Sequence, residues 1–214
     1  MVALVDLIPE LRRRLETVAQ PGKAPQMKAY MKDNFEYLGV TAPERQWAAK
    51  PFVAGGRDAT SAQLLVAAEA CWAQPEREFQ YVAADLLSRW KARLDPNSLP
   101  TVERLARTKS WWDTVDVLAA HVVGSLIANN PGLTATIDAW IDDPDFWIVR
   151  TAILHQLRYG ADTDAERLFG YVDRRCADKE FFIRKACGWA LRQHARHDPD
   201  AVRAYVLDRG ELLS

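Results

Sequence analysis

Pairs of neighbouring aromatic residues recur at a fixed interval in the second half of this chain. Trp111-Trp112, Phe146-Trp147 and Phe181-Phe182 follow one another at intervals of 35 residues. Each pair opens a long segment whose apolar residues have helical spacing, and each long segment follows a shorter one of the same kind. A chain that repeats in this way, with two helices in each unit, buries its apolar faces by stacking successive units against one another.

The rest of the chain shows the same helical periodicity. In the segment 2–18, for example, Leu4, Leu11 and Leu15 recur on one face. No run of Val, Ile and Thr alternates with polar residues as a β-strand would, and the boundary signals separate about a dozen helices. We therefore predict an all-α protein, a single-domain α-solenoid of about six helix pairs of the HEAT type over residues 1–214, whose second helices line one concave surface.

Composition limits the class of protein. With 214 residues and 49% hydrophobic content, the chain can bury a sizeable core. It lacks an apolar stretch of the roughly 18 residues that a membrane helix needs, and residues 1–16 do not read as a signal peptide, so we expect a cytoplasmic protein. The cysteines Cys71, Cys176 and Cys187 are odd in number and unpaired in spacing, which argues against a disulfide framework and a cysteine-rich zinc site. The net charge of −1 leaves room for a local basic stripe.

The segment that begins at Ser110 carries the strongest local signal. Trp112 and Asp116 are four residues apart, so they project side by side from one helical face. Trp111 and Val115 belong to a separate stripe that suits a core contact. This helix should therefore pack with one face and present an aromatic ring beside a carboxylate on its flank.

The next two long segments carry cations on informative faces. Arg150 lies on an otherwise apolar stripe, where it must snorkel, pair with an acid or meet a ligand. Lys185, Trp189 and Arg192 share a face opposite the apolar side of their helix, which suits contact with a polyanion. The 35-residue interval makes Val115, Arg150 and Lys185 equivalent positions, so the concave surface should be basic and should carry Trp112, Asp116, Trp147, Arg150, Lys185, Trp189 and Arg192.

Several motifs in order together resemble the AlkD-type DNA alkylation-repair glycosylases. They are residues 27–31 (MKAYM), 38–45, 110–116 (SWWDTVD), 150–154 (RTAIL) and 181–189. The resemblance runs from about Met27 to Arg192. It implies a HEAT-like solenoid that removes positively charged N3- and N7-alkylpurines, such as 3-methyladenine and 7-methylguanine, from double-stranded DNA in base excision repair. No metal or organic cofactor is expected, and we predict a monomer.

The resemblance also assigns roles to single residues. Asp116 matches the catalytic aspartate, Trp112 and Trp189 match two tryptophans that flank the lesion, and Arg150 matches an arginine that contacts DNA. Tyr30 and Arg45 match positions near the DNA. From the helical pattern, Trp147, Lys185 and Arg192 are further DNA-binding candidates, with Arg104, Arg107, Lys109 and Arg184 as weaker phosphate contacts.

The expected chemistry agrees with these positions. Alkylation at N3 or N7 makes the purine cationic and therefore a good leaving group. A fixed carboxylate at Asp116 would stabilise the deoxyribose cation that develops, or would orient the attacking water. Tryptophan faces beside the sugar attract positive charge. The resemblance further implies that the base need not be flipped into a deep pocket.

The same residues also have structural interpretations. Trp111 is expected in the core and Trp112 could lie there too, while Asp113 complements the helix dipole. Asp116 could serve only as an ion-pair partner of Arg150. The alternative function is a non-catalytic HEAT-repeat module that binds DNA or protein.

Other polar residues are expected to have no role in chemistry. His121 and His155 lie in apolar helices and should be core residues. His194 and His197 have no third metal ligand nearby, so no metal site is predicted. Four arginines are expected on a solvated outer face: Arg158, Arg167, Arg174 and Arg175.

Overall fold

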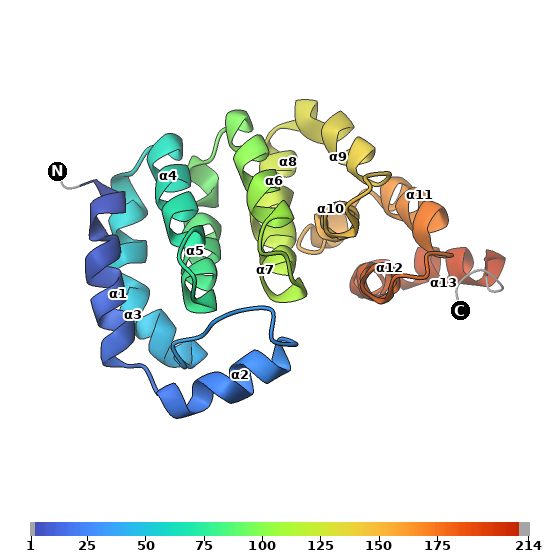
Figure 1. Cartoon of the computed structure of the whole chain (residues 1–214). Helices are drawn as coiled ribbons and strands as arrows, with labels where there is room; N and C mark the ends of the chain where they lie inside the picture. The colour runs from blue at the N-terminus through green and yellow to red at the C-terminus, as the bar shows by residue number, and fades with distance from the viewer. Residues whose placement is uncertain (1–2, 210–214) are drawn as a thin grey trace. The chain divides into compact units, whose positions relative to one another are not determined.

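The computed structural model describes residues 3–209, and these residues form helices and connecting loops without a β-strand (Figure 1). Within this range the one β-type feature is an isolated bridge between Glu36 and Glu76. The all-α prediction is confirmed. Val2, where the first predicted helix begins, lies outside the described residues. None of the described helices is long and apolar enough to cross a membrane.

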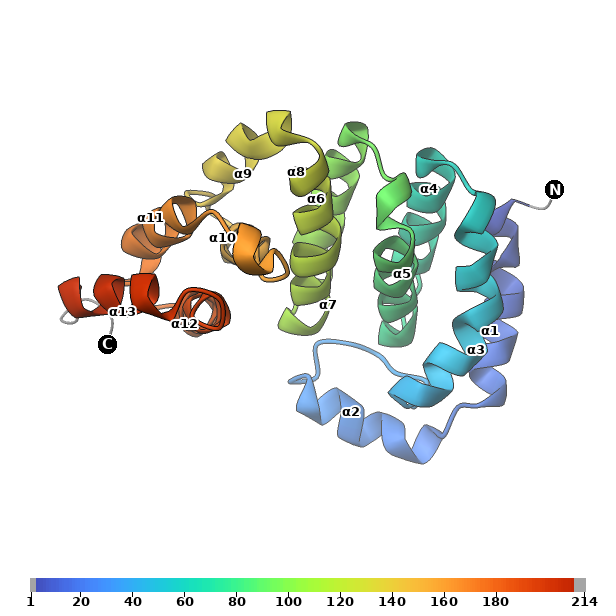
Figure 2. The same cartoon turned by 180° about the vertical axis from the view of Figure 1, so that it is seen from behind.

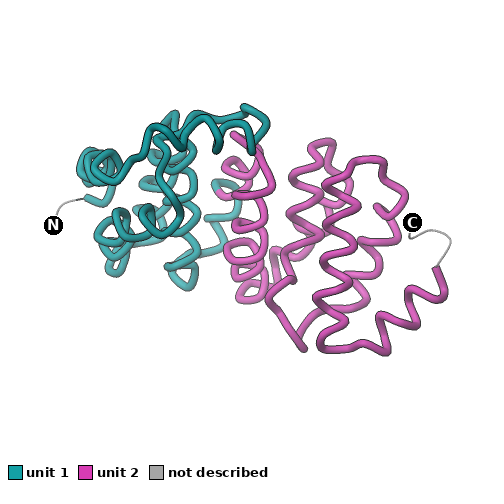
Figure 3. The backbone as a smooth tube through the Cα atoms, turned by 90° about the horizontal axis from the view of Figure 1, so that it is seen from below, with its two compact units in different colours: residues 1–101 teal, residues 102–214 magenta. Residues whose placement is uncertain are grey.

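The chain divides into two compact units, residues 1–101 and residues 102–214 (Figure 3). We call them unit 1 and unit 2, and the boundary falls within helix α6 (Leu99–Arg107). That residues 1–214 form one continuous repeat domain stays a prediction.

Unit 1 is built from helices and their connecting loops. Its α-helices are α1 (Ile8–Thr17), α2 (Ala24–Tyr30), α3 (Ala42–Gly55), α4 (Ser61–Trp72) and α5 (Arg77–Arg89). Helices α4 and α5 lie side by side, as both Figure 1 and Figure 2 show, and α3 packs against α1 and α5. Capping boxes start α3 and α4: Thr41 pairs with Glu44, and Thr60 pairs with Gln63. Leu11, Leu15, Leu64, Phe79 and Leu86 are among the fully buried core residues.

A buried carboxylate holds the loop that leads into α3. Glu78 is fully buried and accepts hydrogen bonds from the backbone N–H groups of Leu38, Gly39 and Val40 at 3.2, 2.9 and 3.0 Å. Gly39 has φ +86°, and a Cβ atom there would lie 2.2 Å from the carbonyl oxygen of Gln20. Only glycine fits this conformation and this close approach. The motif at residues 38–45 thus includes a structural anchor for the start of α3.

Unit 2 is built around helix α10. Besides the second part of α6, its α-helices are α7 (Trp112–Val117), α8 (Gly124–Asn129), α9 (Thr134–Trp140), α10 (Phe146–Leu154), α11 (Ala165–Arg175), α12 (Phe181–His194) and α13 (Pro199–Asp208). Helix α10 contacts α7, α9, α11 and α12. A π-helical segment, Leu118–Val123, joins α7 to α8, so the apolar run predicted after residue 116 is one helical stretch. Such π-helical turns are rare and frequently occur at functional sites.

The aromatic pairs meet at the starts of α7, α10 and α12. Ring centroids of Trp111 and Phe182 are 5.3 Å apart, those of Trp147 and Phe182 4.9 Å, and those of Trp111 and Trp147 5.7 Å. Phe146 stacks on Phe182 with an interplanar angle of 6°. The 35-residue interval in the sequence thus corresponds to direct packing between successive long helices of unit 2.

Candidate active site

Asp116 and Arg150 form a bidentate ion pair between α7 and α10. The Arg150 Nε donates to Asp116 Oδ1 at 2.7 Å, and its Nη2 donates to Oδ2 at 2.8 Å. The third guanidinium nitrogen, Nη1, donates to the carbonyl oxygen of Phe182 on α12. The Arg150 side chain is only 5% exposed and that of Asp116 14%. Arg150 therefore donates hydrogen bonds to protein groups on two other helices. The ion pair between Asp116 and Arg150, which was the structural interpretation of Asp116, is present.

The surroundings of Asp116 have two opposing effects on its pKa. Burial raises the pKa of Asp116 above the ordinary value of an aspartate, and the nearby Asp113 adds to this rise. The hydrogen bonds and the positive charge of Arg150 oppose it and lower the pKa. Both carboxylate oxygens accept hydrogen bonds, which is the arrangement of an ionised group. Arg150 therefore favours the charged form of this buried acid and fixes its orientation.

Asp116 lines an open pocket of about 380 Å³. Trp189 of α12 lines the same pocket, and its side chain is 40% exposed. The pocket is lined by Asp116, Val117, Ala120, His121, Leu157, Arg158, Trp189, Gln193 and Arg196. The structure therefore brings together two of the three predicted catalytic residues, with a carboxylate and an indole on the wall of one cavity.

The third predicted catalytic residue, Trp112, lies on the same helix as Asp116. It occupies the first position of α7, one turn before the acid, and is partly exposed. It does not line the pocket shared by Asp116 and Trp189. Its neighbour Trp111 packs against Trp147 and Phe182, as the core interpretation predicts, although the residue is only partly buried.

Helix α12 has the amphipathic pattern that the sequence predicts. Ile183 and Ala190 are buried, whereas Lys185, Trp189 and Arg192 are exposed. The Lys185 Nζ lies 5.3 Å from the centroid of the Phe181 ring. This face is accessible to a ligand from solvent.

Two predicted DNA contacts are buried instead. Trp147 is 7% exposed and its ring packs against the rings of Trp111 and Phe182. Arg150 is 4% exposed and is held by Asp116. Sequence spacing placed both on the ligand-facing side because a helix wheel does not show how deeply a neighbouring helix covers that side. In this arrangement Trp147 supports the site from within the core, and Arg150 orients the acid.

The two candidates in unit 1 differ from each other in exposure. Tyr30, the last residue of α2, is 71% exposed. Arg45 of α3 has a side chain that is 13% exposed, lies over the ring of Tyr81 at 4.5 Å and reaches Asp85 of α5 at 3.6 Å. Arg45 is therefore largely occupied within unit 1.

The pocket in unit 2 also contains residues that the sequence analysis placed elsewhere. Arg158 was expected on an outer face and His121 in the core, yet both line the pocket beside Asp116. Gln193 and Arg196 were not singled out. They follow Trp189 by four and seven residues, so extending that helical stripe by two turns would have found them. His155 is buried as expected, with its Nδ1 2.6 Å from the carbonyl oxygen of Ala152.

The other three arginines of the expected outer face form ion pairs. Arg167 pairs with Asp138 and Asp164, Arg174 with Asp142, and Arg175 with Asp178. Arg158 and Arg196, by contrast, make no ion pair or side-chain hydrogen bond within the part of the chain that the structure describes. These two guanidinium groups are available to a ligand in the pocket.

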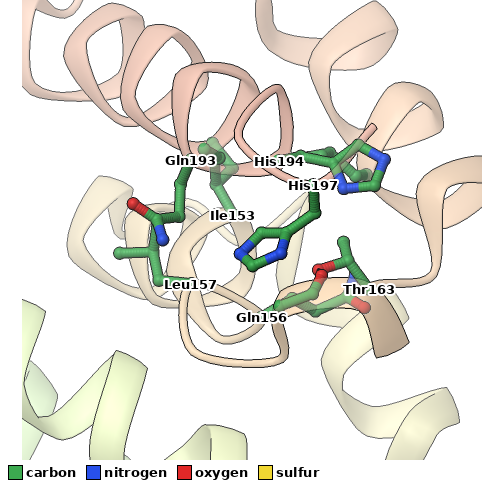
Figure 4. A pocket seen from close by; sticks show the side chains of 10 residues that line it. Ile153, Gln156, Leu157, Thr163, Gln193, His194 and His197 are labelled. Atoms are coloured by element: carbon green, nitrogen blue, oxygen red, sulfur yellow. The ribbon is translucent and has the colours of Figure 1, made fainter. Parts of the chain in front are cut away.

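A second, much smaller cavity of about 10 Å³ lies beside His194 and His197, with Gln156 and Thr163 on its wall (Figure 4). His194 is 5% exposed and neither of its ring nitrogens has a hydrogen-bond partner. Among residues 3–209 there is no group of three His, Cys, Asp or Glu side chains that could hold a metal ion. Leu157 and Gln193 line both this cavity and the Asp116 pocket.

Comparison with known proteins agrees with the resemblance seen in the motifs. The profile of the family described as DNA alkylation repair enzyme matches residues 11–214. The chain is similar to a solved structure, "Predicted DNA alkylation repair enzyme from Enterococcus faecalis", with 32% identity and a TM-score of 0.82 over 89% of each chain. No curated protein matches. The family profile covers nearly the whole sequence, and the chain therefore belongs to the DNA alkylation repair enzyme family.

Proposed function

We propose that this protein is a DNA glycosylase that hydrolyses the N-glycosidic bond of cationic N3- and N7-alkylpurines in duplex DNA. Membership of a DNA alkylation repair family supports a role in DNA repair. The observation that carries the finer proposal is the shared pocket, in which a carboxylate held by two hydrogen bonds stands near an accessible indole.

The reaction suits a carboxylate that stays charged. When the bond between the base nitrogen and C1′ breaks, its electron pair goes to the cationic base, which leaves as a neutral molecule. Positive charge then develops on the deoxyribose, and a water molecule adds at C1′ and loses a proton. Asp116 stabilises the developing charge and is suited to accept that proton. A leaving group that is already cationic needs no general acid.

Arg150 is a positioning residue in this proposal. Two of the approximately four lone-pair sites of the Asp116 carboxylate accept from Arg150, so the others remain for sugar or water. The Arg150 charge also opposes the effect of burial on the Asp116 pKa. The arginine thus keeps the acid ionised without covering all of it.

The aromatic and basic residues supply binding. The face of Trp189 attracts positive charge and excludes water from the reacting sugar, and Trp112 contributes a second ring one turn before Asp116. Exposed Lys185 and Arg192 on α12 neutralise phosphates, which makes DNA binding depend on salt. We propose that the protein acts on DNA as a monomer and needs no metal or organic cofactor.

The test is release of free 7-methylguanine and 3-methyladenine from methylated duplex DNA under single-turnover conditions, with the spontaneous rate subtracted. The wild type should release base, and Asp116→Asn should bind the same DNA but release base about 10²- to 10³-fold more slowly, because it lacks the charge aimed at the sugar. Occupancy is matched by titrating each protein to saturation. Wild-type protein that binds duplex DNA without releasing either base would refute the proposal.

That negative outcome would favour a non-catalytic module that binds DNA. The ion pair between Asp116 and Arg150 would then serve only to join α7 to α10. A protein-binding scaffold would show no salt-dependent affinity for DNA. The binding measurement made in the same experiment therefore separates the two alternatives.

A further inference from the structure

Unit 1 contains an open pocket of about 400 Å³ between α3 and α5. Its lining includes three basic side chains, Lys50, Arg57 and Arg89, and the ring of Trp90. The lining has one acid, Asp85, whose carboxylate lies 3.6 Å from Arg45. Because Arg45 already offsets Asp85, the three cations give this pocket a net positive charge.

These three cations differ from three other arginines of unit 1 that are paired with acids. Arg12 forms a bidentate pair with Glu76, Arg13 pairs with Glu10, and Arg45 pairs with Asp85. No ion pair or side-chain hydrogen bond joins Lys50, Arg57 or Arg89 to any residue between 3 and 209, and all three are exposed. Charges of one sign that gather around a cavity without counter-ions raise the local concentration of the opposite ion.

The aromatic wall of the pocket is held in place. The Trp90 Nε1 donates to the carbonyl oxygen of Val53 at 2.6 Å, and a Cβ atom at Gly56 would come within 2.6 Å of the indole ring. The Arg89 guanidinium lies over this ring, 4.6 Å from its centroid. Arg89 is therefore orientated by the indole while its nitrogens keep their hydrogen-bonding capacity for a ligand.

We propose that Lys50, Arg57 and Arg89 form a phosphate-binding site in unit 1 that contacts the backbone of duplex DNA. The inference rests on the proposed function in taking DNA as the partner, and it adds a binding site that does not include Asp116. Guanidinium and ammonium groups around an open pocket match the charge and the acceptor oxygens of phosphodiesters. The site also replaces Arg45, which is committed to Asp85 and Tyr81, as the main cationic contact of unit 1.

The test compares DNA affinity as a function of salt concentration. In the full chain, Lys50→Gln, Arg57→Gln and Arg89→Gln are combined, and affinity for an undamaged duplex is measured by fluorescence anisotropy. The slope of log K against log salt becomes shallower by roughly 0.9 for every phosphate that the protein no longer neutralises, so the slope of the triple variant should be shallower by between about 1 and 3. Its affinity at low salt should fall about tenfold or more.

Two further variants control for net charge and for folding. Combined Arg13→Gln, Arg174→Gln and Arg203→Gln removes the same charge from exposed arginines outside the pocket and should keep nearly the wild-type slope. A variant that combines Lys50→Arg, Arg57→Lys and Arg89→Lys keeps the three cations, and its slope should be close to that of the wild type. Equal slopes for the pocket variant and the charge control, with both folded by circular dichroism, would overturn the inference.

Failure of the inference is distinguishable from failure of the proposed function. If the wild type releases 7-methylguanine and the pocket variant keeps the wild-type slope, the glycosylase proposal stands and the unit 1 site is wrong. If the wild type has no affinity for duplex DNA, the glycosylase proposal and its DNA site fail together. A pocket variant with altered affinity for inorganic phosphate but unchanged affinity for DNA would also overturn the site as a DNA contact.

Discussion

Each unit contains an arginine–aspartate pair that joins two neighbouring helices, and the two pairs differ in geometry. In unit 2, Arg150 and Asp116 share two hydrogen bonds of 2.7 and 2.8 Å, with side chains 5% and 14% exposed. In unit 1, Arg45 and Asp85 approach to 3.6 Å, and their side chains are 13% and 38% exposed. Arg45 also keeps a buried Nε without a hydrogen-bond partner.

Under the proposed function, this difference distinguishes Asp116, an acid held in one orientation for chemistry, from Asp85, which balances charge. Burial raises the pKa of both Asp116 and Asp85. At Asp116 the bidentate arginine restricts both oxygens to one orientation, beside an open pocket and an accessible tryptophan. At Asp85 a single longer contact leaves the carboxylate more exposed and less constrained. Fixed orientation, rather than the presence of an ion pair, is what a group aimed at a developing charge requires.

The largest expected contrast is in stability when each arginine is removed. Arg150→Gln should lower the free energy of unfolding by about 3–5 kcal/mol at about pH 8, because it leaves a buried carboxylate and the Phe182 carbonyl without their donor. Arg45→Gln should cost about 1 kcal/mol or less, because Asp85 is partly solvated. Urea unfolding of both variants checks this. Equal losses would show that the two pairs are equivalent.

The pH dependence of the Arg150→Gln loss sharpens the same comparison. Without the guanidinium, burial and the charge of Asp113 act on Asp116 unopposed, and its pKa rises further. The cost of the buried charge is complete above that raised pKa and decreases as the pH falls towards it, because the carboxyl takes up a proton. The loss should therefore be smaller at about pH 5 than at about pH 8. A pH-independent loss would mean that the Asp116 charge is not its source.

A smaller effect is expected in the pH profile of base release. If catalysis needs the Asp116 carboxylate, the single-turnover rate should fall with acid at a higher pH than an ordinary aspartate would dictate, because burial raises this pKa. Arg150→Lys keeps a cation but loses the two-pronged hydrogen bonding, so its acid limb should lie at a higher pH still. Spontaneous depurination is measured in parallel and subtracted. Superimposable acid limbs for the two proteins would contradict a positioning role for Arg150.

The smallest effect is expected at Asp85. Because burial raises the pKa of Asp85, its charge is unfavourable in the folded state, and the neutral Asp85→Asn should change the free energy of unfolding by about 0.5 kcal/mol or less at neutral pH. Thermal and urea unfolding provide the measurement. A loss near that of Arg150→Gln would reveal a structural role for Asp85 as strong as that of the pair in unit 2.

Much of the fold was predictable because helices are local structures. Apolar spacing predicted the all-α class and the buried and exposed faces of α12, and the 35-residue interval predicted that long helices would be equivalent neighbours. Both signals depend on residues three or four positions apart or on stacking between units that are adjacent in sequence. The motif at residues 110–116 likewise placed Trp112 and Asp116 on one helix.

The site was less predictable because its geometry depends on contacts across distant helices. The sequence named Asp116, Trp189 and Arg150, and it left open whether Arg150 faces DNA or the acid. It gave no sign that Trp147 would be covered by Phe182, or that Arg158 would line the pocket while Arg167 and Arg174 pair with acids. A helix wheel contains no information about which neighbouring helix covers a face.

The amino-acid sequence by itself determined the helical class, the family and the chemical groups available for catalysis, because these depend on local spacing and residue type. Tertiary packing decided which cations are neutralised and which remain for a ligand. Arg150 and Asp116 are 34 residues apart and meet only because α10 packs on α7. Ion pairs form between groups a few ångströms apart in space, whatever their separation along the chain. Their partners are therefore set by the packing of helices, and a sequence period alone does not identify them.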